Sequence, residues 1–100
     1  MPHLICYDIT KDSLRTKVGK KIIEYGLDRI NKSVYLGTLK ESSLILLVQL
    51  LSNLVVQKGD PSDSIIVIYV SGQSVQDMIV LGKNDLDKDQ LSGDKHTLIV

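Results

Sequence analysis

One carboxylate stands in an otherwise apolar stretch near the N-terminus, and its chemistry is the first question that the sequence raises. Asp8 lies in the run LICYDI, between Tyr7 and Ile9. A buried carboxylate is costly unless it is hydrated, paired or bound to a metal. Its oxygens are hard ligands that suit Mg²⁺, and a metal held there could activate water beside a phosphoryl group. The simpler interpretation is that Asp8 caps the following turn or helix together with Thr10.

A group of cations follows Asp8 in the sequence. The candidate phosphate-binding residues are Arg15, Lys17, Lys20, Lys21, Arg29 and Lys32. Such side chains bind phosphates without reading sequence, although a solvated helix face is the ordinary alternative. Residues 1–58 carry nine Lys or Arg and five Asp or Glu, whereas residues 59–100 carry three and seven. The net charge is zero, so any polyanion is expected to bind the basic N-terminal body alone.

Composition is typical of a globular protein with one domain. One hundred residues, of which 43% are hydrophobic and 24% charged, are enough for one modest core. Cys6 is the only cysteine, so no disulfide can form within the chain and a cytoplasmic location is expected. The longest apolar block, Leu44 to Val56, is too short and too polar to span a bilayer, so no membrane partner is expected.

Two segments have the apolar period of amphipathic helices. The first follows a cluster of good N-cap residues over 10–13 and ends before Gly26, which can take the left-handed conformation. Its apolar residues recur at helical spacing: Leu14, Val18, Ile22 and Tyr25. The second helix is expected from about Glu41 to Gln57, with Gly59 and Pro61 closing it. Each helix therefore has one face for a sheet to cover.

The remaining apolar segments are rich in strand-forming residues. We expect one strand over His3–Ile9 and two within Leu27–Leu39, where Asn31-Lys32 marks a break. Ser64–Val70 is β-branched and nearly all apolar, which is typical of a central strand. A fifth strand is predicted over Val75–Gly82.

The order of these elements predicts an α+β fold. It is the ferredoxin-like βαββαβ arrangement, an antiparallel sheet with both helices on one face, with an additional C-terminal strand. Residues 1–82 form this domain, and residues 83–100 are an acidic C-terminal extension that forms a short edge strand or is disordered. Many unrelated functions use this fold, so function must be argued from the site.

Three segments resemble the CRISPR-associated protein 2 family: YDITKDSLRTKVGK, YGLDRINKSVYLG and SDSIIVIYV. The resemblance covers about residues 3–82, in the family's order and with similar spacings. It implies a ferredoxin-like homodimer that acts in CRISPR spacer acquisition, as the adaptor of a complex with the CRISPR-associated integrase. Several family members are also described as metal-dependent endonucleases on RNA or double-stranded DNA. The implied partners are therefore a second copy, the integrase, and duplex DNA or single-stranded RNA.

The resemblance also implies a role for particular residues. Asp8 matches the strand-end aspartate that is catalytic and binds the metal, Mg²⁺ or another divalent cation, together with the same residue of the partner subunit. Arg15 and Arg29 match basic family positions, and Lys17 stands where a second arginine is common, which keeps the charge but loses the bidentate fork. Two positions of the second motif are also carried over: Ser33, and Tyr35 in place of the usual Phe.

Two alternatives remain open at this point. Asp8 distinguishes a nuclease, which needs its carboxylate, from a non-catalytic adaptor that holds duplex DNA for an integrase. More distantly, the sequence resembles virulence-associated protein D, a toxin ribonuclease. That group shares the early strand-borne aspartate and a Ser-Val-Tyr strand, which Ser33-Val34-Tyr35 matches.

Overall fold

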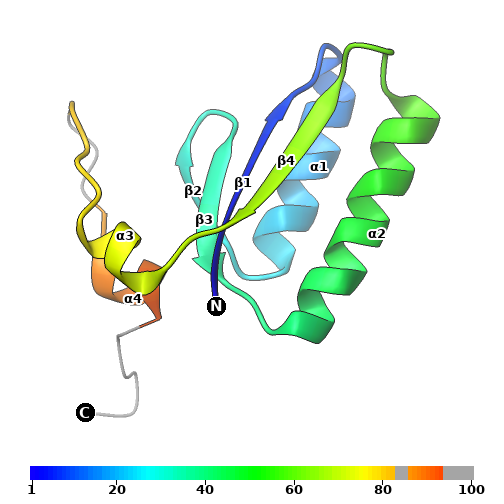
Figure 1. Ribbon diagram of the computed structural model, residues 1–100. Helices are drawn as coiled ribbons and strands as arrows, with labels where there is room; N and C mark the ends of the chain where they lie inside the picture. Colours follow the sequence, from blue (N-terminus) through cyan, green and yellow to red (C-terminus); the bar gives the residue numbers. More distant parts are fainter. Residues whose placement is uncertain (83–85, 94–100) are drawn as a thin grey trace.

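The computed structural model describes residues 1–82 and 86–93 and contains one four-stranded antiparallel sheet. The elements are, in order, β1 (Pro2–Asp8), α1 (Asp12–Glu24), β2 (Asp28–Asn31), β3 (Val34–Thr38), α2 (Glu41–Lys58), β4 (Ser64–Tyr69), α3 (Gly72–Gln76) and α4 (Lys88–Ser92). Helices α1 and α2 lie side by side on one face of the sheet, and α3 and α4 lie toward the other (Figure 1). The predicted ferredoxin-like βαββαβ core is therefore confirmed.

Strand β1 lies in the interior of the sheet, in the order β2-β3-β1-β4. It pairs with both neighbours; Ile5, for example, lies opposite Tyr35 of β3 and Val67 of β4. Because successive side chains of a strand point to opposite faces, Ile5 and Tyr7 face the helices, whereas Cys6 and Asp8 face the other side. Ile5 is fully buried in the main core.

Two groups of buried side chains form on the two faces of the sheet. The larger lies under α1 and α2 and consists of Ile5, Ile9, Leu14, Val18, Ile22, Leu27, Tyr35, Leu39, Leu47 and Leu51. The smaller lies on the opposite face, where α3 and α4 cover Leu36 with Val75 and Leu91. Burial of the helical stripe that the apolar spacing predicts is what holds α1 on the sheet.

Strand β4 lies at the edge of the sheet, not at its centre as its apolar sequence predicts. Its Ile65 and Val67 pack against the main core. On the other face Ile66 and Ile68 are 51% and 46% exposed. An apolar run indicates a strand that is buried on both faces. In this chain, only the face of β4 that packs against the main core is buried.

The fifth strand predicted over Val75–Gly82 is wrong. The Ser71 hydroxyl accepts a hydrogen bond from the backbone N–H of Ser74 at 3.0 Å, which caps the short helix α3. Val75 is then buried against Leu36 of the sheet, and this packing holds the helical turn in place. Helix α4 lies within the extension that begins at residue 83, and the strand-prone end of the chain, 97–100, lies outside the described residues.

Gly19 lets helix α1 approach the sheet closely. A Cβ atom at this position would lie 2.5 Å from Tyr35 Oη and 3.3 Å from Tyr7 Oη. Tyr35 is buried, and its hydroxyl is hydrogen-bonded to that of Tyr7 at 3.1 Å. The Tyr35 ring therefore cannot move aside without breaking its hydrogen bond with Tyr7. A side chain at position 19 would clash with the Tyr35 hydroxyl.

We expect Gly19→Ala to lower the free energy of unfolding by about 1–3 kcal/mol through overpacking. This loss opposes the helix propensity, which favours alanine over glycine by about 1 kcal/mol. Tyr35→Phe removes the hydroxyl that the new methyl group meets, so in that background Gly19→Ala should be neutral or stabilising. Urea denaturation of the four proteins measures both effects. An equal loss in the two backgrounds would contradict the steric explanation.

Candidate functional site

A cavity of about 860 Å³ opens between helix α1 and the β2–β3 hairpin. Its charged lining consists of four cations and one carboxylate: Arg15, Lys20, Arg29, Lys32 and Glu24. The remaining lining residues are Tyr7, Thr16, Gly19, Ile23, Ser33 and Tyr35. The excess of positive charge over a partly apolar floor suits an anion that also has an apolar or aromatic part.

The structure brings most of the sequence-predicted binding residues into this cavity and places two elsewhere. Arg15, Lys20, Arg29, Ser33 and Tyr35 all line it. Lys17 lines a separate, smaller cavity. Lys21 lines neither and forms an ion pair with Glu24 at 3.3 Å. The cations that follow one another along α1 therefore do not form one surface, because successive residues of a helix point in different directions.

Both arginines of the cavity are fastened to nearby backbone carbonyls. Arg15 Nη1 donates to the carbonyls of Ile9 at 2.9 Å and Thr10 at 3.2 Å, and its guanidinium pairs with Asp12. Arg29 donates through Nη2 to the carbonyl of Lys32 at 3.0 Å. Side chains that are already held in place lose less conformational entropy when an anion binds them. The two guanidinium groups are thus positioned before a ligand arrives.

Two tyrosines form the floor of the cavity. The rings of Tyr7 and Tyr35 stack with centroids 5.9 Å apart, and their hydroxyls are 3.1 Å apart. Burial, followed by the hydrogen bond with Tyr35, raises the pKa of Tyr7 to about 12. Tyr7 therefore keeps its proton at neutral pH, so it can donate a hydrogen bond to an anion but cannot act as a general base. The sequence carried Tyr35 over as a site residue but did not indicate that Tyr7 lies beside it in this cavity.

Asp8 lies outside the cavity, at the exposed end of β1 and on the opposite side of the strand from Tyr7. It is paired in register with Ser64 of β4. It does not cap helix α1, whose N-cap is Lys11 without a side-chain hydrogen bond, so the cap predicted from residues 10–13 is also absent. Within residues 1–82 and 86–93, no group of three or more His, Cys, Asp or Glu side chains is arranged to hold a metal.

A single exposed carboxylate still fits the chemistry of Mg²⁺. This ion is usually bound through one or two carboxylates, keeps several waters and takes further oxygens from substrate phosphates. Asp8 has the exposure and the hard oxygen ligands that such a site needs. Because one chain offers one carboxylate here, a second would have to come from another copy of the chain.

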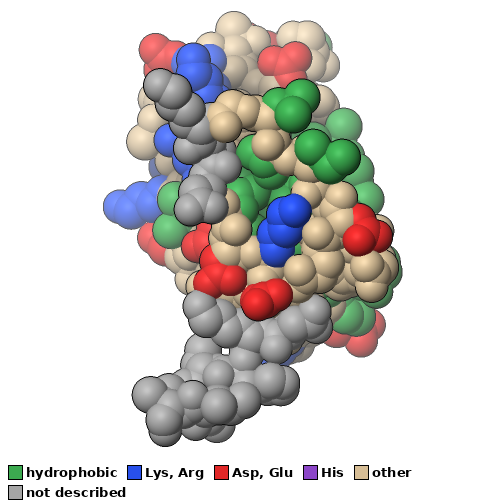
Figure 2. Space-filling view, turned by 90° about the vertical axis from the view of Figure 1, so that its left-hand side faces the viewer, with side chains coloured by type: hydrophobic (Ala, Val, Ile, Leu, Met, Phe, Trp, Pro, Cys, Tyr) green, Lys and Arg blue, Asp and Glu red, His purple; other side chains and the backbone are tan. Residues whose placement is uncertain are grey.

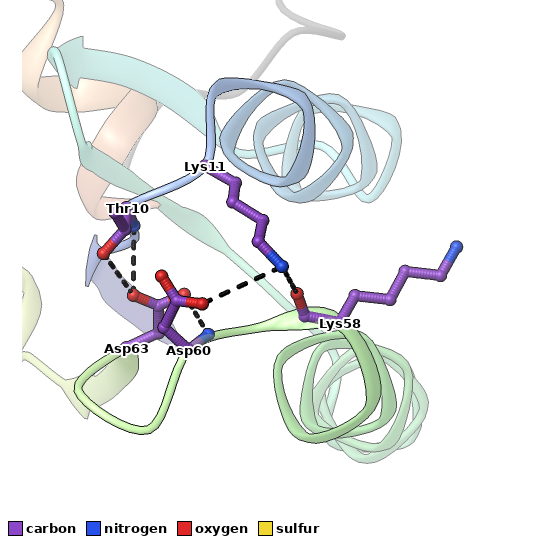
Figure 3. Close-up of polar contacts among 5 residues, drawn as sticks. All are labelled: Thr10, Lys11, Lys58, Asp60 and Asp63. Carbon is purple, nitrogen blue, oxygen red and sulfur yellow. Dashed lines mark hydrogen bonds and ion pairs between the residues drawn. The ribbon is translucent and has the colours of Figure 1, made fainter.

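A cluster of hydrogen bonds centred on Asp63 fixes the loop that follows Asp8 (Figure 3). Asp63 Oδ1 accepts from the backbone N–H and from the hydroxyl of Thr10, both at 3.0 Å. Its Oδ2 accepts from the backbone N–H of Asp60 at 2.9 Å. These bonds, led by the one from Asp60, lower the pKa of Asp63. Asp63 therefore joins the β1–α1 loop to the α2–β4 loop directly beside the Asp8–Ser64 pair.

These observations define a class of small ferredoxin-like protein with a cationic cavity on one side of its sheet and an isolated strand-end aspartate on the other. The family model of CRISPR associated protein Cas2 matches residues 1–78. The chain is 34% identical over 79 residues to CRISPR-associated endoribonuclease Cas2 2 of Pyrobaculum aerophilum, covering 79% of this chain and 84% of the relative. It is 35% identical over 79 residues to CRISPR-associated endoribonuclease Cas2 of Aeropyrum pernix, covering 79% and 83%. The chain belongs to the Cas2 family.

Solved structures share this fold. A hypothetical protein, TT1823 from Thermus thermophilus, is 28% identical with a TM-score of 0.69, and the match covers 85% of this chain and 94% of that one. The crystal structure of Streptococcus pyogenes Cas2 at pH 6.5 is 21% identical with the same TM-score of 0.69, over 82% and 100% of the two chains. The family match favours the first resemblance over that to the toxin ribonuclease.

Asp63 makes the stability of the protein depend on pH in a defined direction. Its folded-state pKa lies below its ordinary value, so its contribution is present above about pH 4, the unfolded-state pKa, and is lost as the pH falls through the folded-state pKa. The difference in unfolding free energy between wild type and Asp63→Ala should therefore be largest at pH 6–7 and shrink below about pH 4. Urea denaturation across this range measures it, with Asp28→Ala, an exposed aspartate of β2, as the control. A difference that does not change with pH would contradict this role.

Proposed function

We propose that this protein is a homodimeric, cytoplasmic component of CRISPR adaptation. It holds nucleic acid as the adaptor for the CRISPR-associated integrase and cleaves phosphodiester bonds with a divalent cation at Asp8. The observation that carries the nucleic-acid role is the cavity beside α1, where four cations surround two stacked tyrosines. Membership of the Cas2 family supports the CRISPR role. Within the described residues, no helix is long and apolar enough to cross a membrane.

The cavity supports nucleic-acid binding through both parts of a nucleotide. Arg15 and Arg29 bring guanidinium charge to the cavity, and their N–H groups that are not bonded to backbone carbonyls are left for phosphate oxygens, while Lys20 adds a point charge. The partly exposed ring of Tyr7, with the buried Tyr35 behind it, provides an aromatic surface of the kind on which a base stacks. Such contacts bind a strand with little preference for its sequence.

The uncovered part of the sheet supports a homodimer. Ile66 and Ile68 of β4 leave an apolar surface on the side away from α2, where hydrophobic side chains gather in one patch (Figure 2). Beyond α3, Ile79 and Leu81 are 83% and 90% exposed. A segment of this kind can add to the sheet edge of a second copy by strand pairing. A twofold contact through this face places the Asp8 of each protomer at the same interface.

Cleavage would require both copies of Asp8. Mg²⁺, when bound, supplies Lewis-acid polarisation of the phosphoryl group and lowers the pKa of a bound water. Two carboxylates that face each other repel, and a cation between them relieves this repulsion. The chain's own contribution is to hold Asp8 at a fixed strand end, through the Asp8–Ser64 pair and the loop that Asp63 fastens. The relatives' names as endoribonucleases favour RNA as the substrate that is cleaved.

The proposed dimer contact is tested by placing a charge in it. Ile66→Glu buries an unpaired carboxylate at the interface and should raise the dimer dissociation constant by at least about a hundredfold. Ile45→Glu is the matched control, because Ile45 lies on the outer surface of α2 with 53% of its surface exposed, against 51% for Ile66. Sedimentation velocity over a range of protein concentrations measures both variants. Dimers of unchanged stability in Ile66→Glu would place the contact elsewhere.

Loss of the Asp8 carboxylate tests the catalytic role. Asp8→Asn keeps the size of the side chain and removes its charge. Loss of a residue that supports a metal ligand lowers activity by about 10- to 100-fold, and loss of the ligand itself should cost more. Mg²⁺-dependent cleavage of labelled single-stranded RNA should therefore fall at least about 100-fold. Duplex DNA is assayed in parallel. The variant must remain dimeric, and Asp28→Asn serves as the control for a lost surface charge. Equal cleavage by Asp8→Asn and wild type would remove Asp8 from catalysis, and absence of cleavage by wild type would leave the protein as a non-catalytic adaptor.

A further inference from the structure

A second cavity, of about 390 Å³, opens where the N-terminal part of α1 meets the C-terminal end of α2. Three lysines from three segments line it: Lys11 from the β1–α1 loop, Lys17 from α1 and Lys58 from α2. Ser13 and Gln57 add polar side chains. It shares no lining residue with the cavity beside the hairpin. It is therefore a separate feature that the proposed function does not yet use.

The three lysines differ in what balances their charge. Lys11 Nζ donates to the carbonyl of Lys58 at 3.2 Å and lies 3.8 Å from Asp60. Figure 3 shows the side chain of Lys58 extending away from Asp60 and Asp63. No carboxylate of the described residues lines the cavity into which Lys17 and Lys58 project. The nearby carboxylates, Asp60 and Asp63, therefore balance the charge of Lys11.

Lys17 and Lys58 line the same cavity, which brings two like charges together. The nearby Lys58 lowers the pKa of Lys17, and Lys21 adds a smaller effect. The helices that carry the two lysines are held together by the shared core that includes Leu14 and Leu51. The end of α2 is held as well, because the backbone N–H of Gly59 donates to the carbonyl of Val55 at 3.0 Å.

Two adjacent like charges on fixed helices are unfavourable unless an anion lies between them. We propose that Lys17 and Lys58 together bind one phosphate group, with Lys11 adding to the local positive field and Ser13 offering a hydroxyl donor. A phosphate accepts hydrogen bonds from several donors at once and cancels the repulsion between the two ammonium groups. The donors of this phosphate site come from both α1 and α2.

The phosphate is either part of a nucleic-acid backbone or a free anion, and the first source rests on the proposed function. Arg15 of the first cavity and Lys17 of the second are two residues apart near the start of α1. Because side chains two residues apart on a helix point to different sides, a strand has to wrap around the start of α1 to reach both cavities. The sequence predicted Lys17 as a phosphate ligand, but Lys58 follows 41 residues later, and only the packing of α2 on α1 brings it there.

Salt dependence of binding tests the site on nucleic acid. On duplex DNA, the logarithm of the binding constant falls linearly with the logarithm of the salt concentration. Each phosphate contact adds roughly 0.9 to the steepness of this slope. The double variant Lys17→Gln, Lys58→Gln should reduce this slope by about one, and each single variant by nearly as much, because both lysines bind the same phosphate. Lys40→Gln, at the opposite end of α2, is the control and should leave the slope unchanged. Binding is measured without Mg²⁺, so loss of cleavage cannot affect the result.

Inorganic phosphate tests the site without nucleic acid. Titration should shift the backbone amide NMR signals of Ser13 and Gly59 in wild type, and these shifts should be absent in the double variant. A reduced duplex slope in the double variant identifies a backbone phosphate as the ligand. If the phosphate-induced NMR shifts are lost in the double variant while the duplex slope is unchanged, the ligand is a free anion. This result holds even if the protein binds no nucleic acid. An unchanged slope together with no phosphate shifts in wild type overturns the proposal.

Discussion

Strand β1 can present only every second side chain to the helices, and the positions of both candidate sites depend on this alternation. Ile5 is fully buried under the helices and Tyr7 reaches the floor of the cationic cavity, so Cys6 and Asp8 must face the other way. The strand is hydrogen-bonded along both edges, and a shift of one residue would move Ile5 out of the core. The cationic cavity and the candidate metal ligand are thereby kept on opposite sides of one strand.

Thr10, in the loop that follows β1, is bonded to two different parts of the structure. Its backbone N–H and hydroxyl donate to Asp63, and its carbonyl accepts from Arg15. Arg15 thus supports the loop beside Asp8 while it lines the cavity on the far side of the sheet. A site needs side chains whose own positions are fixed by their neighbours, and here one loop fixes residues of both sites.

Local patterns in the sequence were enough to predict the fold but not the site. The spacing of Leu14, Val18 and Ile22 predicted α1, and the break at Asn31-Lys32 predicted the hairpin, because both depend on residues near in sequence. The edge position of β4 depends on whether other segments cover Ile66 and Ile68, and the spacing of apolar residues in the sequence does not show this. The contact between Thr10 and Asp63 joins residues 53 positions apart, so only the folded chain shows it.

The same limit explains the segment beyond β4. Val75–Gly82 has the composition of a strand, but the Ser71 cap and the burial of Val75 on Leu36 stabilise a helical turn at its start. The grouping of Arg15 with Arg29 likewise depends on the placement of α1 beside the hairpin. Resemblance to a family named the candidate residues, whereas their division between two cavities and an exposed strand end required the three-dimensional arrangement.

Helices α3 and α4 also bear on how far the proposed assembly could grow. They cover the outer face of the sheet over Leu36 and leave the part around Ile66 open. If two such open parts met about a twofold axis, as the proposed homodimer requires, each would block the other and the outside of the pair at this face would consist of helices. Stacking of sheet upon sheet is a hazard of exposed apolar strands, and the proposed contact would end it at this face after the second molecule.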